Sequence, residues 1–156
     1  HDTLLNNLRL ACPAATTEEA VAAARRAGLA ELIAALPRGL ETVLAEDGTD
    51  LSQGEAQRVA LARAILKDVP LLIVDEGTSA QDAGNEARLL TVLQELSRHH
   101  TVLLLSHRLA TVKDAANIGV MEAGRLVEQG THAELLESGR RYREFLQAGR
   151  EIDGPA

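Results

Sequence analysis

The chain has 156 residues, of which 46% are hydrophobic and 25% charged, a composition typical of one globular domain or a large part of one. Its net charge of −7 argues against a chain that grips nucleic acid, so we expect no nucleic-acid partner. Cys12 is the only cysteine, which excludes an internal disulfide or a cysteine-based metal cluster, and no apolar run approaches the roughly 20 residues of a membrane span.

The chain begins at His1 rather than Met, and we expect that a preceding part is missing. Thr16 with Glu19 matches the capping box, in which side chains satisfy backbone N–H groups at a helix start. Gly28 suits the left-handed position just after a helix. Apolar spacing predicts these segments: a leucine-bearing helix over residues 4–10 closed by Pro13, helices over 18–27, 29–36 and 52–66, and a loop over 38–50.

An uninterrupted apolar run over residues 71–74 predicts a strand buried on both faces of a parallel sheet. Asp75 and Glu76 stand at its carboxyl end, where open α/β sheets place ligands. Carboxylates there can hold a hard cation such as Mg²⁺ and orient a water, although the same acids can equally open an ordinary loop.

A second buried strand over residues 101–106 ends in His107, and a helix over about 83–97, capped by Asp82, joins the two strands. Strand, helix and strand in this order predict a βαβ unit and an α/β fold. His107 then lies at the same sheet edge as the carboxylates. It can donate a hydrogen bond to a phosphate there, or be a loop histidine of no consequence.

The rest of the chain predicts a hairpin and two helices. Strands over 117–121 and 125–128 flank a turn at Ala123 and Gly124, and Thr131 forms a capping box with Glu134. The helix that follows stops at Gly139. The expected organisation is a helical subdomain over 1–68, an α/β core over 69–150 and a tail over 151–156.

The helix start at Ser52 suits an anion. Exposed N–H groups and the positive end of the helix dipole favour phosphate, and Gly54 allows a ligand close to the backbone. Glu55, three residues after Ser52, completes a capping box, so the alternative is that these residues only cap the helix.

The order and spacing of these segments resemble the nucleotide-binding domain of ATP-binding-cassette (ABC) transporters. The matching pieces are the signature motif, the Walker B strand, the D-loop and the H-switch, at residues 51–55, 71–76, 78–82 and 106–108. Residues 130–136 with Tyr142 look like the exporter branch, and residues 2–8 are similar to the segment after the Q-loop. The resemblance implies a P-loop NTPase fold of the ABC ATPase type, with a parallel-sheet core and an N-terminal helical subdomain. It also implies an ATP-hydrolysing module that powers a membrane exporter.

By this resemblance, Asp75 would hold Mg²⁺, Glu76 would be the general base that polarises the attacking water, and His107 would contact the γ-phosphate. ATP and Mg²⁺ are the implied cofactors. The implied reaction is in-line phosphoryl transfer to water, in which positioning and charge stabilisation do most of the catalysis.

The resemblance also implies a dimer, because one domain supplies donors to only one side of the phosphates. Ser52 and Gly54, with their neighbours Gln53 and Glu55, would reach the nucleotide of a second nucleotide-binding domain, and Asp82 would couple the two sites. A transmembrane domain is the other implied partner. The chain would then lie at the cytoplasmic face of the cell membrane, as part of a membrane protein.

The sequence departs from the family pattern in several places. The Walker A loop, the aromatic that stacks on adenine and the Q-loop glutamine are absent, so we expect weak ATP binding and no hydrolysis by this chain alone. Gln53 replaces the usual Gly, Glu55 stands where Gln is frequent, and Gln81 replaces the usual Leu. An altered signature beside an intact Glu76 favours one half of an asymmetric heterodimer. The alternatives are a non-transport ABC ATPase and a non-catalytic assembly domain of the same fold.

Overall fold

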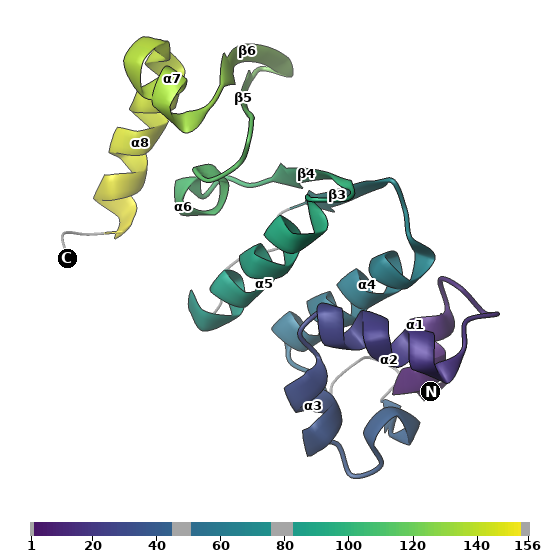
Figure 1. The fold of residues 1–156 in the computed structure, drawn as a ribbon. Helices are drawn as coiled ribbons and strands as arrows, with labels where there is room; N and C mark the ends of the chain where they lie inside the picture. Colours follow the sequence, from purple (N-terminus) through teal and green to yellow (C-terminus); the bar gives the residue numbers. More distant parts are fainter. Residues whose placement is uncertain (1, 45–50, 76–82, 154–156) are drawn as a thin grey trace. The chain divides into compact units, whose positions relative to one another are not determined.

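A computed structural model describes residues 2–44, 51–75 and 83–153 (Figure 1). They belong to two compact units, His1–Leu103 and Leu104–Ala156, which we describe separately. The elements are β1 (Asp2–Thr3), α1 (Leu4–Arg9), α2 (Thr17–Arg26), α3 (Ala30–Ala35), the 3-10 helix η1 (Gly39–Glu41), β2 (Val43–Leu44), α4 (Gln53–Lys67), β3 (Leu71–Asp75), α5 (Ala83–Leu96), β4 (Thr101–Leu105), α6 (Leu109–Val112), β5 (Ile118–Glu122), β6 (Arg125–Gly130), α7 (His132–Ser138) and α8 (Arg140–Asp153).

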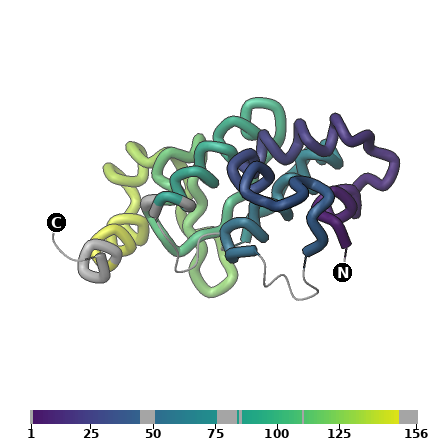
Figure 2. Tube along the Cα trace, turned by 90° about the horizontal axis from the view of Figure 1, so that it is seen from below, coloured from purple at the N-terminus to yellow at the C-terminus, as the bar shows by residue number. Residues whose placement is uncertain are grey.

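Helices α1, α2 and α4 pack against one another in the first unit and lie side by side in both views (Figures 1 and 2). Their interface is aliphatic, and Leu4, Leu8 and nearby Leu29 are fully buried. The predicted capping box is confirmed, since the Thr16 N–H donates to Glu19 Oε2 at 2.7 Å. Gly28 follows α2 with a φ of 77°, the left-handed conformation that its position predicts.

Two predictions for the first 50 residues are wrong in detail. Leu10 is 68% exposed rather than on an apolar face, because α1 ends one residue before it. The segment taken as a loop contains η1 and β2, and β2 pairs antiparallel with β1, Asp2 opposite Leu44. Strands of two residues are too short for alternation to reveal them.

Strands β3 and β4 pair with each other, as the βαβ pattern predicts. Both begin at the same end, where the Thr101 N–H donates to the Pro70 carbonyl at 2.9 Å, so the pair is parallel. Helix α5 turns Leu89, Leu93 and Leu96 into the interior.

The prediction that β3 is buried on both faces is wrong for the described structure. Exposure alternates along the strand, and Leu71 and Ile73 are 49% and 58% exposed. Leu72, on the other face, packs among residues of α4 and α5. Within the described ranges no element covers the face of Leu71 and Ile73, so these apolar side chains remain exposed.

The second unit contains the predicted hairpin. β5 and β6 pair antiparallel with Glu122 opposite Arg125, so Ala123 and Gly124 form a two-residue turn. Their φ values of 48° and 75° fit a type I′ turn, which matches the twist of the strands. A register shift after Val120 marks a β-bulge.

The core of this unit is small and contains the only tyrosine. Tyr142 is buried with Ile118 and Leu135, and partly buried Leu109, Val120 and Leu146 surround them. A 2.6 Å hydrogen bond joins the Tyr142 hydroxyl to His132 Nδ1, and the two rings meet edge to face. Burial raises the pKa of Tyr142.

Glu128 of β6 binds the start of α8. Its carboxylate accepts backbone N–H groups from Arg140, Arg141 and Tyr142 at 2.7, 2.8 and 3.0 Å. These are donors that a helix start leaves without internal partners, and a negative charge there also suits the helix dipole. The N–H groups of Arg141 and Tyr142 are the main reason that the pKa of Glu128 is lowered from 4.5.

This lowered pKa predicts a sign for acid destabilisation. The contribution of Glu128 to stability is present above about pH 4.5 and is lost as pH falls through its lower folded-state value. In Glu128→Gln the group no longer titrates, so we expect the apparent Tm to fall less steeply between about pH 5 and pH 3 than in the parent chain. Thermal unfolding across this range measures the difference, and equal slopes would exclude the assignment.

Candidate functional site

The predicted capping box at Ser52 is present, and it places four predicted site residues together at the start of α4. Ser52 Oγ accepts the Glu55 N–H at 3.3 Å, while the Ser52 N–H donates to Glu55 Oε2 at 2.7 Å. The Ser52 hydroxyl also donates to the same oxygen at 2.7 Å. Ser52 and Gln53 are exposed, whereas Gly54 is buried.

Helix α4 is a firm support for this helix start. Val59, Leu61 and Ala62 on its inner side are buried. Arg63 Nε donates to the Asn7 carbonyl at 2.7 Å, and Arg63 Nη2 donates to Asn7 Oδ1 at 2.9 Å. These two hydrogen bonds connect α4 to α1, although the residues are 56 positions apart in the sequence. Together with the buried side chains, they hold in place the helix that begins after Ser52.

Asp75 is the last residue of β3 and is exposed there. An exposed carboxylate at the carboxyl end of a parallel strand has the chemistry that a hard cation requires, so this residue fits the expected role toward Mg²⁺. Glu76 and Asp82 lie outside the described residues. Among the residues that are described, no three His, Cys, Asp or Glu side chains gather as a metal-binding group.

His107 belongs to the second unit, in the short connection between β4 and α6, and it is exposed. Its two neighbours fix the backbone around it, since the Arg108 N–H donates to Ser106 Oγ at 3.0 Å. The start of α4 and the end of β3 belong to the first unit, so the predicted site residues are divided between the two units.

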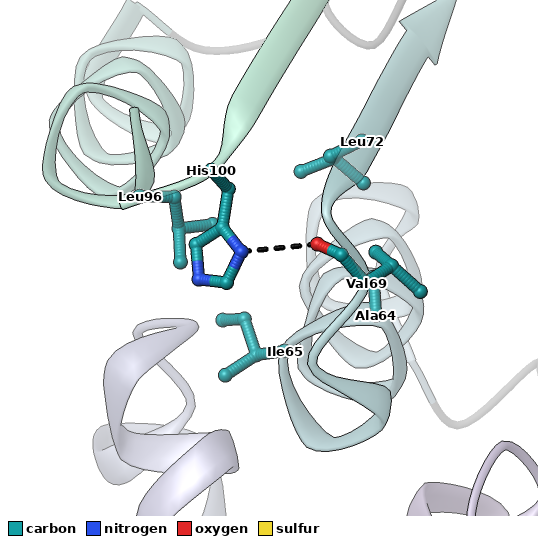
Figure 3. Close-up of a pocket in the computed structure, with 6 residues that line it drawn as sticks. All are labelled: Ala64, Ile65, Val69, Leu72, Leu96 and His100. Carbon is teal, nitrogen blue, oxygen red and sulfur yellow. Dashed lines mark hydrogen bonds between the residues drawn. The ribbon is translucent and has the colours of Figure 1, made fainter. Parts of the chain in front are cut away.

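A small cavity of about 10 Å³ lies between α4, β3 and α5, beside His100 (Figure 3). His100 Nδ1 donates to the Val69 carbonyl at 3.0 Å, which fixes the proton on that nitrogen because a carbonyl can only accept. The cavity walls are mostly apolar and include Ile65, Leu72 and Leu96. It has room for about one water and none for a nucleotide.

Two of these contacts could not be predicted from the sequence. The capping-box spacing predicts that Glu55 accepts the Ser52 N–H. It does not predict that Glu55 also accepts the Ser52 hydroxyl, because that hydrogen bond depends on the rotamers of both side chains. The hydrogen bond from His100 to the Val69 carbonyl connects the segment after α4 to the start of β4. The two residues are 31 positions apart, so no local sequence pattern predicts the contact.

Comparison with known proteins agrees with these features. A family model described as ABC transporter matches residues 2–79. The chain is 44% identical over 157 residues to the ATP-dependent lipid A-core flippase of Alkalilimnicola ehrlichii, which covers 100% of the chain and 26% of that protein. It is 47% identical over 142 residues to the flippase of the same name from Chromobacterium violaceum, covering 91% and 24%.

A solved structure of a bacterial Atm1-family ABC exporter with ATP bound superposes with a TM-score of 0.85 at 39% identity, over 94% of this chain and 26% of that one. The chain belongs to the ABC transporter family and has the P-loop fold of its ATPases. It spans about a quarter of the length of the curated relatives that it matches. None of the described helices is long and apolar enough to cross a membrane.

Proposed function

We propose that this chain is part of the ATP-hydrolysing domain of an ABC exporter, the part that carries the signature helix, the Walker B strand and the H-switch. One observation carries the proposal: a relative named as an ATP-dependent lipid A-core flippase matches the whole chain at 44% identity. The exposed donors at the start of α4 and the exposed carboxylate that ends β3 are consistent with it. The exporter names of the relatives disfavour a non-transport ATPase or a pure assembly domain.

In this proposal three residues take part in the hydrolysis of a bound nucleotide. Asp75 holds Mg²⁺, which when bound neutralises charge on the phosphates. Glu76 accepts the proton of the attacking water, and His107 donates a hydrogen bond to the γ-phosphate. The work of the protein is to position the water in line with the bond that breaks and to stabilise the charge that develops.

The start of α4 serves a second nucleotide site in this proposal. Ser52 and Gly54, with their neighbours Gln53 and Glu55, reach the γ-phosphate of a nucleotide held by another nucleotide-binding domain, and Asp82 couples the two sites. The dimer supplies donors on both sides of a highly charged group. A transmembrane domain is the second partner in this proposal, and the chain lies at the cytoplasmic face of the cell membrane.

Replacing Ser52 with Ala in the full-length protein tests this assignment. The variant loses the hydroxyl donor but keeps the backbone, so we expect MgATP hydrolysis to fall by about tenfold or more, as for one hydrogen bond to a charged group. Ser97→Ala, at the exposed residue that follows α5, is the matched control and keeps parental activity. Unchanged hydrolysis in Ser52→Ala would remove α4 from the nucleotide site.

Gln53 provides the test for an asymmetric pair of sites. If the side chain at this position weakens the signature, Gln53→Gly raises the rate of ATP hydrolysis several-fold despite the lower helix propensity of Gly. A rate equal to that of the parent would contradict a weakened site.

The relatives are named as lipid A-core flippases, so lipid A-core is the first transport substrate to test. The measurement is whether lipid A-core stimulates ATP hydrolysis by the full-length protein.

A further inference from the structure

The start of α4 already holds an anion from its own chain. Ser52 has two hydrogen-bond donors, the backbone N–H and the hydroxyl. Both donate to the same oxygen of Glu55, Oε2, each at 2.7 Å. A hydroxyl has one proton, so while it donates to Glu55 it cannot donate to another acceptor.

We infer that the Glu55 carboxylate competes with the terminal phosphate of ATP for Ser52, so that nucleotide engages α4 only when the Ser52–Glu55 contact opens. The inference rests on the proposed function, which brings a phosphate to this helix start. A carboxylate and a phosphate also repel each other, and both favour the positive end of the same helix.

The neutral amide of Gln at position 55 relieves both effects. Its carbonyl oxygen still accepts the Ser52 N–H, which preserves the cap, but it is a weaker acceptor for the hydroxyl and carries no charge. Glu55 is therefore assigned as a residue that sets the affinity of the site, without a part in bond breaking.

The chain contains a matched control for the cap itself. At the start of α7, Glu134 Oε2 accepts the Thr131 N–H at 2.8 Å and the Thr131 hydroxyl at 2.9 Å. Glu134→Gln therefore makes the same chemical change in a cap of nearly the same geometry, at the start of a different helix.

The experiment measures MgATP hydrolysis by the full-length protein as a function of ATP concentration. We expect Glu55→Gln to lower KM for MgATP by more than about fivefold with little change in kcat. Removing one like charge at about 4 Å in water contributes about fivefold, and release of the Ser52 hydroxyl adds to it. Glu134→Gln keeps the parental KM. A KM for Glu55→Gln equal to that of the parent, or above it, overturns the inference.

Combining the variants separates competition from bulk charge. In a Ser52→Ala background the hydroxyl that Glu55 holds is gone and only the charge effect remains, so Glu55→Gln should lower KM by clearly less than it does in the parent. An undiminished effect means that Glu55 acts through charge alone and overturns the competition. If Ser52→Ala itself leaves hydrolysis unchanged, the proposed function of α4 fails; if it impairs hydrolysis while Glu55→Gln matches Glu134→Gln, only this inference fails.

Discussion

In the full-length protein, Glu76→Gln is expected to reduce MgATP hydrolysis by about 100-fold or more while nucleotide still binds. The amide preserves the size of the side chain but cannot accept the proton of the attacking water, and general-base catalysis contributes about 10²–10⁴ to a rate. Binding is retained because the residue acts on the water, not on the nucleotide. Turnover assays paired with equilibrium binding of MgATP make the comparison.

Glu95→Gln is the matched control, since Glu95 is an exposed carboxylate on α5 and the substitution is chemically the same. It should hydrolyse ATP at the parental rate. Hydrolysis by Glu76→Gln at the rate of Glu95→Gln would remove Glu76 from its assigned role. Loss of both binding and turnover would instead indicate a role in holding the nucleotide.

The largest expected effect on stability comes from Gly139→Ala. Gly139 has a φ of −76°, so the backbone conformation tolerates any residue, but the space does not. A Cβ there would lie 2.7 Å from the Leu135 carbonyl oxygen and 2.8 Å from Glu128 Oε2. The first contact is with a backbone atom, and the second is with the carboxylate that binds the start of α8. Moving either atom away from the added methyl group would therefore weaken hydrogen bonds. We expect local destabilisation of about 1–3 kcal/mol.

Hydrogen exchange of the amides at the start of α8 reports this effect directly. Their protection should drop by roughly 5- to 100-fold in Gly139→Ala, in proportion to the lost stability. Ser138→Ala changes the preceding exposed residue and should leave protection near the parental value. Equal protection in the two variants would show that Glu128 accommodates a methyl group without releasing α8.

Local chemistry is where sequence and structure agree best. Three capping boxes, at Thr16, Ser52 and Thr131, and the turn at Ala123 and Gly124 are all confirmed, because each depends on residues within three or four positions of one another. The βαβ order is also confirmed, because short apolar runs next to turn residues favour strands over helices.

Agreement ends where the structure depends on distant partners. Arg63 reaches Asn7 across 56 positions, and Glu128 reaches α8 across 12 to 14, through side chains whose spacing follows no period. At the candidate site, the sequence could predict which residues begin α4 and end β3. It could not predict that the hydroxyl of Ser52 is already engaged, since that follows from the rotamer of Glu55.

The contact between His132 and Tyr142 has a spectroscopic consequence. The chain has one tyrosine and no tryptophan, so its near-ultraviolet absorbance and emission come almost entirely from a single buried phenol in the second unit. Tyrosine emission from this chain therefore monitors the packing of α7 against α8. A fluorescence signal from α4 requires an introduced tryptophan. Because this chain has no other tryptophan, the indole emission would come from that residue alone.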